Sequence, residues 1–130
     1  MLKIRKQSVT GTDPFTTHQN ILVDIRYGPF SGSNTLQVVD FEAAASRNTV
    51  GSIFNTPAGD WYSSTLDVTA FPYINLIGVT QFRLAFQLDD NDGLGADTLQ
   101  FYSGDYAETA TAHNYRSSIM CLRPGLFNIS

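Results

Sequence analysis

The sequence predicts an all-β fold, a jelly-roll-like antiparallel β-sandwich, and two observations lead to it. Short segments rich in β-branched and aromatic residues return at intervals of about ten to fifteen residues. Gly, Pro, Asn and Asp, which favour tight turns, separate these segments. The 130 residues suffice for a single domain with one core, since a chain of this size buries roughly two thirds of its unfolded surface.

Two strands are predicted near the start of the chain. Residues 2–9 alternate apolar and polar side chains, as a half-buried strand does. Residues 20–27 are rich in β-branched and aromatic side chains. Because alternate side chains of a strand share one face, one set in the second strand should point into the core. That set is Ile21, Val23 and Ile25.

The spacing of apolar residues changes once, between residues 36 and 46. Apolar side chains there fall three to four positions apart, which is typical of a helix. Several good helix formers follow Asp40, whose carboxylate suits the N-cap position. The sequence therefore predicts one short helix over about residues 40–46.

The middle of the chain returns to a β pattern. Residues 49–54 and 60–66 are predicted to form a hairpin, because a segment rich in turn-forming residues joins them. A single helical turn is predicted over residues 67–71, before Pro72.

The most regular alternation lies at residues 80–88, and residues 98–103 are predicted to pair with this strand across an acidic loop. A last short strand is predicted at 119–122, within an atypical tail that begins at about residue 110. In strand 80–88, Arg83 and Gln87 should point outward. The side chains predicted to point inward are Phe82, Leu84, Phe86 and Leu88.

Charge and composition argue against two classes of function. The chain has 8 Lys and Arg against 12 Asp and Glu, a formal net charge of −4, whereas binding nucleic-acid phosphates requires clustered cations. Lys3 and Arg5 share a strand face and are interpreted as a solvated surface. No apolar run of about 18 residues and no charged-then-apolar leader occur, so we expect no membrane span and no signal peptide in this chain.

The sharpest local feature is an acidic segment rich in Asp and Asn, at residues 89–97. It carries five side-chain oxygen donors, and closely spaced carboxylates become favourable around Ca²⁺. The EF-hand pattern fails, because apolar residues stand at two of its ligand positions, so a calcium site here would be irregular. The alternative is a hairpin loop whose Asp and Asn side chains cap their own backbone. The candidate metal ligands are Asp89, Asp90, Asp92 and Asp97.

Aromatic residues suggest a platform for sugar binding, because the apolar face of a pyranose packs against an aromatic ring. The candidates are Trp61 and Tyr62, with Tyr102 and Tyr106 as additions. The alternative is that Trp61 fills the core and Tyr62 faces solvent. In either interpretation the alternation of a strand exposes one residue of the pair.

No catalytic motif is present. A Gly-x-Ser-x-Gly elbow, a His-Glu-x-x-His helix and a phosphate-binding Gly-rich loop are all missing from the sequence. The two histidines, His18 and His113, are interpreted as solvated or locally hydrogen-bonded. With Glu42 and Glu108 as the only glutamates, a glycosidase pair is disfavoured, and a small hydrolase is kept only as a remote alternative.

Several segments together resemble the DNRLRE-type β-sandwich module of large bacterial secreted and surface proteins, which is similar to carbohydrate-binding modules. They include Gly11-Thr12-Asp13-Pro14-Phe15, Gly59-Asp60-Trp61-Tyr62, Asp89-Asp90-Asn91-Asp92 and Phe101-Tyr102-Ser103-Gly104. The resemblance covers about residues 2–108. It implies a jelly roll, an accessory role and an extracellular or cell-surface location.

Two departures from the module matter. Its usual first strands are missing before residue 2, and the Arg123-Pro124 pair arrives late. The sandwich is therefore expected to be incomplete, and its open strand edges predict a homodimer through the N-terminal strand or the tail after residue 110.

The leading hypothesis for function is a non-catalytic binding module for polysaccharide or another cell-surface component. The alternative is a structural or cohesion domain that forms homo-oligomers by edge-strand pairing. Calcium binding at residues 89–97 would stabilise such a domain.

Overall fold

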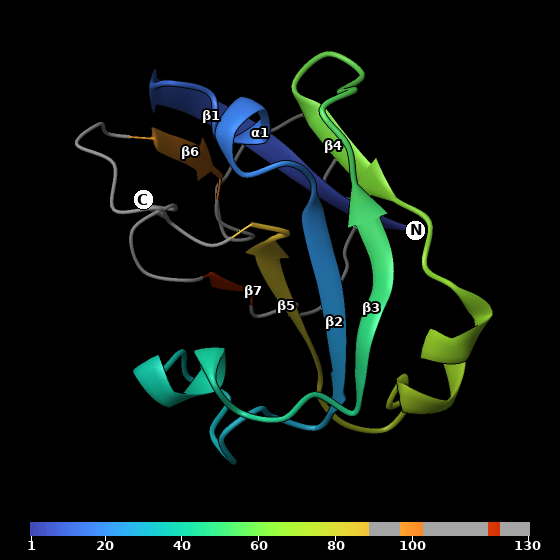
Figure 1. Cartoon of the computed structure of the whole chain (residues 1–130). Helices are drawn as coiled ribbons and strands as arrows, with labels where there is room; N and C mark the ends of the chain where they lie inside the picture. Colours follow the sequence, from blue (N-terminus) through green and yellow to red (C-terminus); the bar gives the residue numbers. More distant parts are fainter. Residues whose placement is uncertain (89–96, 103–119, 123–130) are drawn as a thin grey trace.

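The computed structural model describes residues 1–88, 97–102 and 120–122, and it confirms the predicted all-β sandwich (Figure 1). The strands are β1 (Leu2–Gly11), β2 (Ile21–Tyr27), β3 (Arg47–Ile53), β4 (Trp61–Ser64), β5 (Thr80–Phe86), β6 (Asp97–Phe101) and β7 (Met120–Leu122). The helical elements are all short: α1 (Pro14–Thr17) and the 3₁₀ turns η1 (Val38–Phe41) and η2 (Val68–Tyr73).

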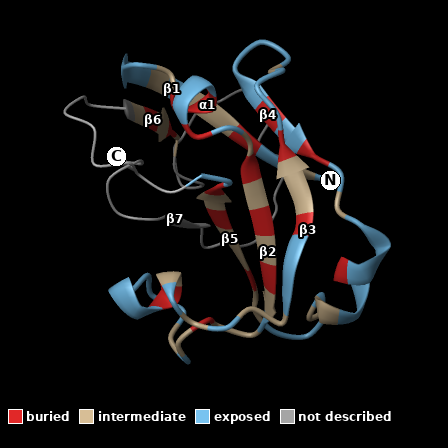
Figure 2. Ribbon diagram, in the orientation of Figure 1, coloured by how far each residue is buried: buried red, intermediate tan, exposed pale blue. Residues whose placement is uncertain are grey.

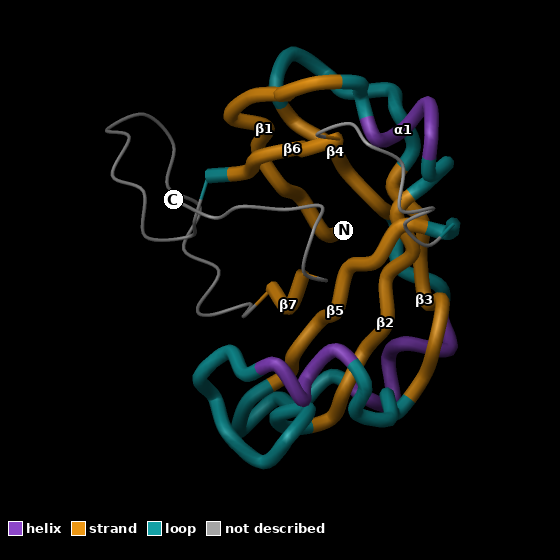
Figure 3. The backbone as a smooth tube through the Cα atoms, turned by 60° about the vertical axis from the view of Figure 1, so that its left-hand side comes forward, coloured by secondary structure: helices purple, strands orange, loops and turns teal. Residues whose placement is uncertain are grey.

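The strands form two sheets, which lie as two layers (Figure 3). One sheet has the order β4-β1-β6 and the other the order β3-β2-β5-β7. All neighbouring strands are antiparallel except β5 and β7, which run parallel. The chain passes repeatedly from one sheet to the other, as in the predicted jelly-roll-like sandwich.

Both strand partnerships predicted across loops are wrong. Residues 49–54 and 60–66 do not form a hairpin, because β3 pairs with β2 while β4 pairs with β1 in the other sheet. Residues 98–103 do not pair with β5, because β6 pairs with β1. Alternation shows which face of a strand is buried, but it does not show whether the next strand continues the same sheet or crosses to the facing one.

The core lies between the sheets, and Figure 2 shows its buried positions along β2. Ile21, Val23 and Ile25 are fully buried, as predicted. From the other layer, the ring of Tyr62 stacks on Phe15 with centroids 5.2 Å apart and meets Phe101 edge-on at 6.2 Å. Phe15 reaches this cluster from α1, whose N-cap Asp13 accepts a 3.0 Å hydrogen bond from the Phe15 N–H.

The predicted helix at 40–46 is wrong. The structure has the 3₁₀ turn η1, and Asp40 lies inside it, fully buried, with Oδ2 accepting a 2.8 Å hydrogen bond from the Gln37 N–H. The carbonyls that a helix would use internally instead accept bonds from Arg83, at 3.0 Å for Phe41 and 2.7 Å for Ala43. This tertiary contact overrides the helix propensity of the alanines.

Two side chains of the predicted strand 80–88 lie differently from the prediction, Leu88 because β5 ends at Phe86 and Arg83 because the η1 loop covers it. Leu84 and Phe86 are buried as expected, but Leu88 lies beyond the strand and is exposed. Arg83 was expected to point into solvent, yet its side chain is only 13 % exposed and forms a 2.7 Å ion pair with Asp24. The outer surface of this sheet is therefore partly covered by the loop that contains η1.

The N-terminal strand lies in the middle of its sheet. Residues 2–5 of β1 pair with β4 and residues 6–11 pair with β6. Strand β1 therefore has a neighbour on each side, each along half of its length, and the homodimer stays a prediction. Among the described strands, β4 and β6 end one sheet and β3 and β7 end the other. Strand β7 belongs to the tail after residue 110, the second segment named in the dimer prediction.

Candidate functional site

The side chains of Trp61 and Tyr62, which are neighbours in β4, lie on opposite faces of the sheet. Tyr62 lies opposite Ile4 and is 1 % exposed, whereas Trp61 lies opposite Arg5 and is 46 % exposed. The prediction that one of the pair is exposed is confirmed. The alternative in which Trp61 fills the core is wrong, and Tyr62 is removed from the sugar-binding candidates because its ring is buried.

A row of side chains crosses the outer face of the three-stranded sheet. Trp61 of β4 is the cross-strand partner of Arg5 in β1. On the other side of β1, Lys6 pairs with Phe101, and the Tyr102 N–H donates a 3.0 Å hydrogen bond to the Arg5 carbonyl. Directly opposite residues in an antiparallel sheet point to the same face, so Trp61, Arg5 and Tyr102 lie side by side. We call these three residues the aromatic row.

Contacts on both sides hold the central arginine of this row. The centre of the Arg5 guanidinium lies 5.1 Å from the centroid of the Tyr102 ring, within the range of a cation–π contact. Its Nη2 lies 3.8 Å from a carboxylate oxygen of Asp60, the residue before β4. The Asp60 carboxylate places an opposite charge beside the guanidinium, which is the cation of the row.

The spacing of the row suits an extended ligand. Neighbouring strands lie about 4.8 Å apart, so Trp61 and Tyr102, which are separated by β1, present their rings about 10 Å apart. Polar side chains continue the same face. Lys3 lies opposite Ser63, and the Ser8 hydroxyl donates a hydrogen bond to Oε1 of Gln100. The face thus combines aromatic surfaces with donors and acceptors, as ligand sites generally do.

Two of the predicted ligand residues thus share one site, and one member of the row was missed. Trp61 and Tyr102 were predicted from the sequence as ligand residues, whereas Arg5 was interpreted only as part of a solvated face. The alternation of residues 2–9 places Arg5 outward, which is the available signal. Its position between the two rings depends on the pairing of β1 with β4 and β6, which alternation does not specify.

The other sequence candidates lie outside the described residues. Asp89, Asp90, Asp92 and Tyr106 are not described, and Asp97 is described only through its backbone, which pairs with Gly11. The calcium interpretation therefore stays a prediction. Within the described ranges, no group of three or more His, Cys, Asp and Glu side chains could hold a metal ion.

His18 was interpreted as solvated or locally hydrogen-bonded, and the structure rules out the solvated alternative. It is buried at the end of α1, and its ring lies 5.9 Å from that of Phe86. In the part of the chain that the structure describes, no helix is long and apolar enough to cross a membrane.

Comparisons with family models, with curated proteins and with solved structures found no match to this chain. The resemblance to DNRLRE-type modules therefore stays a prediction.

Proposed function

We propose that this protein is a non-catalytic binding module for polysaccharide, accessory to a larger secreted or surface protein. The observation that carries the proposal is the aromatic row: Trp61, Arg5 and Tyr102 stand next to one another across three strands on one face. The resemblance to bacterial surface modules adds the accessory role and the extracellular location.

The row supplies both interactions that a sugar chain needs. The C–H face of a pyranose packs on the exposed ring of Trp61, and covering about 100 Å² of apolar surface contributes about 2.5 kcal/mol. The guanidinium of Arg5 then donates hydrogen bonds to hydroxyl groups at the ring edge. Because Asp60 and Tyr102 already position Arg5, less side-chain entropy is lost on binding.

Affinity electrophoresis through gels that contain soluble polysaccharides tests this proposal. The native protein should be retarded by at least one polymer from a panel of glucans, xylans, mannans, pectins and alginates. Trp61→Ala should weaken that binding by roughly tenfold or more, since it removes the stacking surface. Tyr27→Ala is the matched control, because Tyr27 is an exposed aromatic of the other sheet. Equal retardation of both variants would remove the aromatic row from the site.

A second candidate function, a cohesion domain that associates with further copies, is favoured by exposed apolar side chains in the loops around η1 and η2. The most exposed are Ile77 at 98 % and Leu76 at 90 %, with Val38 and Val68 also largely exposed. These apolar surfaces would be removed from water if a second copy of the chain covered them. Multi-angle light scattering at high micromolar concentration tests it: a mass of two or more chains supports association, and a monomer excludes it.

A further inference from the structure

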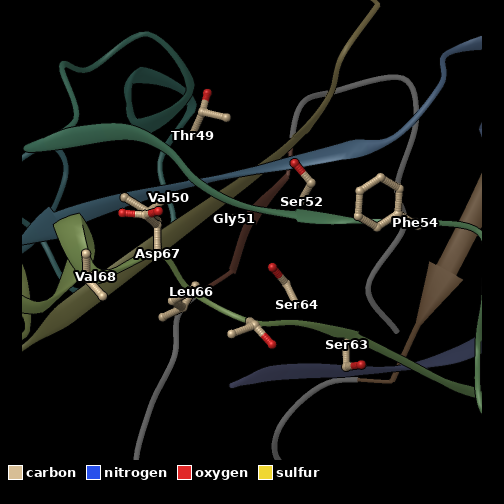
Figure 4. Close-up of a pocket in the computed structure, with 11 residues that line it drawn as sticks. Thr49, Val50, Gly51, Ser52, Phe54, Ser63, Ser64, Leu66, Asp67 and Val68 are labelled. Carbon is tan, nitrogen blue, oxygen red and sulfur yellow. The ribbon is translucent and has the colours of Figure 1, made fainter.

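A groove of about 730 Å³ lies where the edges of β3 and β4 come together (Figure 4). Residues 49–52 and Phe54 form one wall, and residues 63–68 form the other. The volume falls in the range of about 300–1,000 Å³ that is usual for small-molecule sites. Strands β3 and β4 belong to different sheets, and the groove lies between them. A hairpin of the same two strands, as predicted from the sequence, would leave no groove there.

Five of the eleven residues that line this groove carry hydroxyl groups. They belong to Thr49, Ser52, Ser63, Ser64 and Thr65. Each hydroxyl both donates and accepts hydrogen bonds, so together they match the hydroxyl groups of a sugar without requiring a particular orientation. At one end stands the ring of Phe54, which is 55 % exposed and offers a stacking surface.

Asp67 is the charged residue of the lining, and its position is fixed. One carboxylate oxygen, Oδ1, accepts a 2.8 Å hydrogen bond from the Thr69 N–H at the start of η2. This bond lowers the pKa of the Asp67 carboxyl, which keeps the group ionised at ordinary pH. A fixed carboxylate accepts hydrogen bonds from sugar hydroxyls and repels carboxylate or sulfate groups on a ligand.

The floor of the groove holds a buried hydroxyl without a partner among the described residues. Ser64 is 3 % exposed, and its Oγ makes no hydrogen bond there. In Figure 4 this oxygen points into the space between β3 and β4. A Cβ at Gly51 would lie 2.4 Å from it, so the Ser64 hydroxyl occupies the space that a side chain at position 51 would need. Buried polar groups are almost always satisfied, so an unpaired hydroxyl at this position lowers the stability of the protein.

The groove continues the surface of the aromatic row. Ser63 lines the groove and lies two residues after Trp61, on the same outward face of β4. A polymer that lies on Trp61 can therefore extend along β4 and over its edge into the groove.

We propose that the groove between β3 and β4 binds a neutral saccharide unit, as a second subsite for the polymer that lies on the aromatic row. This inference rests on the proposed function and adds the charge class of the ligand. It assigns hydrogen bonding to Asp67 and the groove hydroxyls, and stacking to Phe54.

The test is an amide-resolved NMR titration of the intact chain with neutral cellohexaose, xylohexaose and mannohexaose, and with anionic oligogalacturonate as comparator. Shifts at residues 49–54 and 63–68, together with shifts at Arg5 and Tyr102, are expected with a neutral oligosaccharide. Shifts confined to the aromatic row would overturn the groove site and leave the proposed function standing. Absence of shifts with every probe would overturn both, and a preference for oligogalacturonate at the groove would overturn its neutral specificity.

Two variants separate binding from structure. Asp67→Asn keeps an oxygen to accept from Thr69 and should lower affinity for the neutral ligand about tenfold. Glu42→Gln, at the exposed C-cap of η1 and outside the groove lining, is the control and should leave affinity unchanged. Thr65→Val, which removes an exposed groove hydroxyl and keeps the shape of the side chain, should weaken binding severalfold without lowering the melting temperature appreciably. Unchanged affinity in both groove variants would refute the site.

Discussion

At the scale of single residues, Arg83 connects parts of the chain that are distant in sequence. Its guanidinium forms an ion pair with Asp24 of β2 and donates hydrogen bonds to the carbonyls of Phe41 and Ala43. It also lies over the ring of Phe30, at 4.9 Å from its centroid. One side chain thus attaches the η1 loop to the four-stranded sheet.

Replacing Arg83 by Met should lower the free energy of unfolding by about 3–5 kcal/mol, because Asp24 would remain largely buried without its partner. Urea denaturation measures the change. Arg26→Met is the control, since Arg26 donates one bond to the Ala44 carbonyl from an exposed position, and it should cost less than about 1 kcal/mol. Equal effects of the two substitutions would contradict this role for Arg83.

The buried Tyr62 makes stability depend on pH at the alkaline end. Burial, and secondly the nearby Asp13 carboxylate, raise the pKa of the Tyr62 hydroxyl above its ordinary value of 10.0. The unfolded chain therefore loses this proton before the folded protein does, so the contribution of Tyr62 is complete below about pH 10 and is lost as pH rises through the folded pKa. Thermal melts from about pH 8 to about pH 11 should show a steeper decline in the native protein than in Tyr62→Phe. Parallel declines would mean that the Tyr62 hydroxyl titrates normally.

At the scale of elements, β4 connects the core, the groove and the aromatic row within four residues. Tyr62 enters the core, Ser64 lies under the groove, and Trp61 stays on the surface. The close approach of β4 to β3 depends on the missing side chain at Gly51, because a Cβ there would lie 2.4 Å from Ser64 Oγ.

Gly51→Ala should therefore destabilise the protein by about 1–3 kcal/mol through overpacking. Adding Ser64→Ala removes the clashing oxygen and should restore part of this loss, and a double-mutant cycle of unfolding free energies measures the coupling. Strictly additive effects would show that the two positions do not meet in solution.

The sequence was informative about faces of elements and uninformative about their neighbours. It predicted the buried faces of β2 and much of β5, because alternation follows directly from burial. It missed the crossing between β3 and β4, since a loop that crosses between sheets and a loop that closes a hairpin use the same turn residues. The helix at 40–46 was wrong for a related reason: its carbonyls bind Arg83, which is distant in sequence.

At the scale of the whole molecule, the aromatic row and the groove each combine residues from more than one strand. Trp61 and Tyr102 were predicted as ligand residues, but only the order β4-β1-β6 brings Arg5 between them. The same order makes β4 an edge, which creates the groove against β3. The proposed polysaccharide site thus depends on the order of the strands. The residue types could be predicted from the sequence, but their arrangement could not.

Intrinsic fluorescence tests the central claim most directly, because Trp61 is the single tryptophan of the chain and reports only on its own surroundings. Titration with the polysaccharide that retards the protein should shift the Trp61 emission to shorter wavelength and give a saturable binding curve, since a sugar ring that covers the exposed indole removes water from it. Arg5→Ala should weaken this curve without moving the melting temperature appreciably. A bound polysaccharide that leaves the Trp61 emission unchanged would contradict the account.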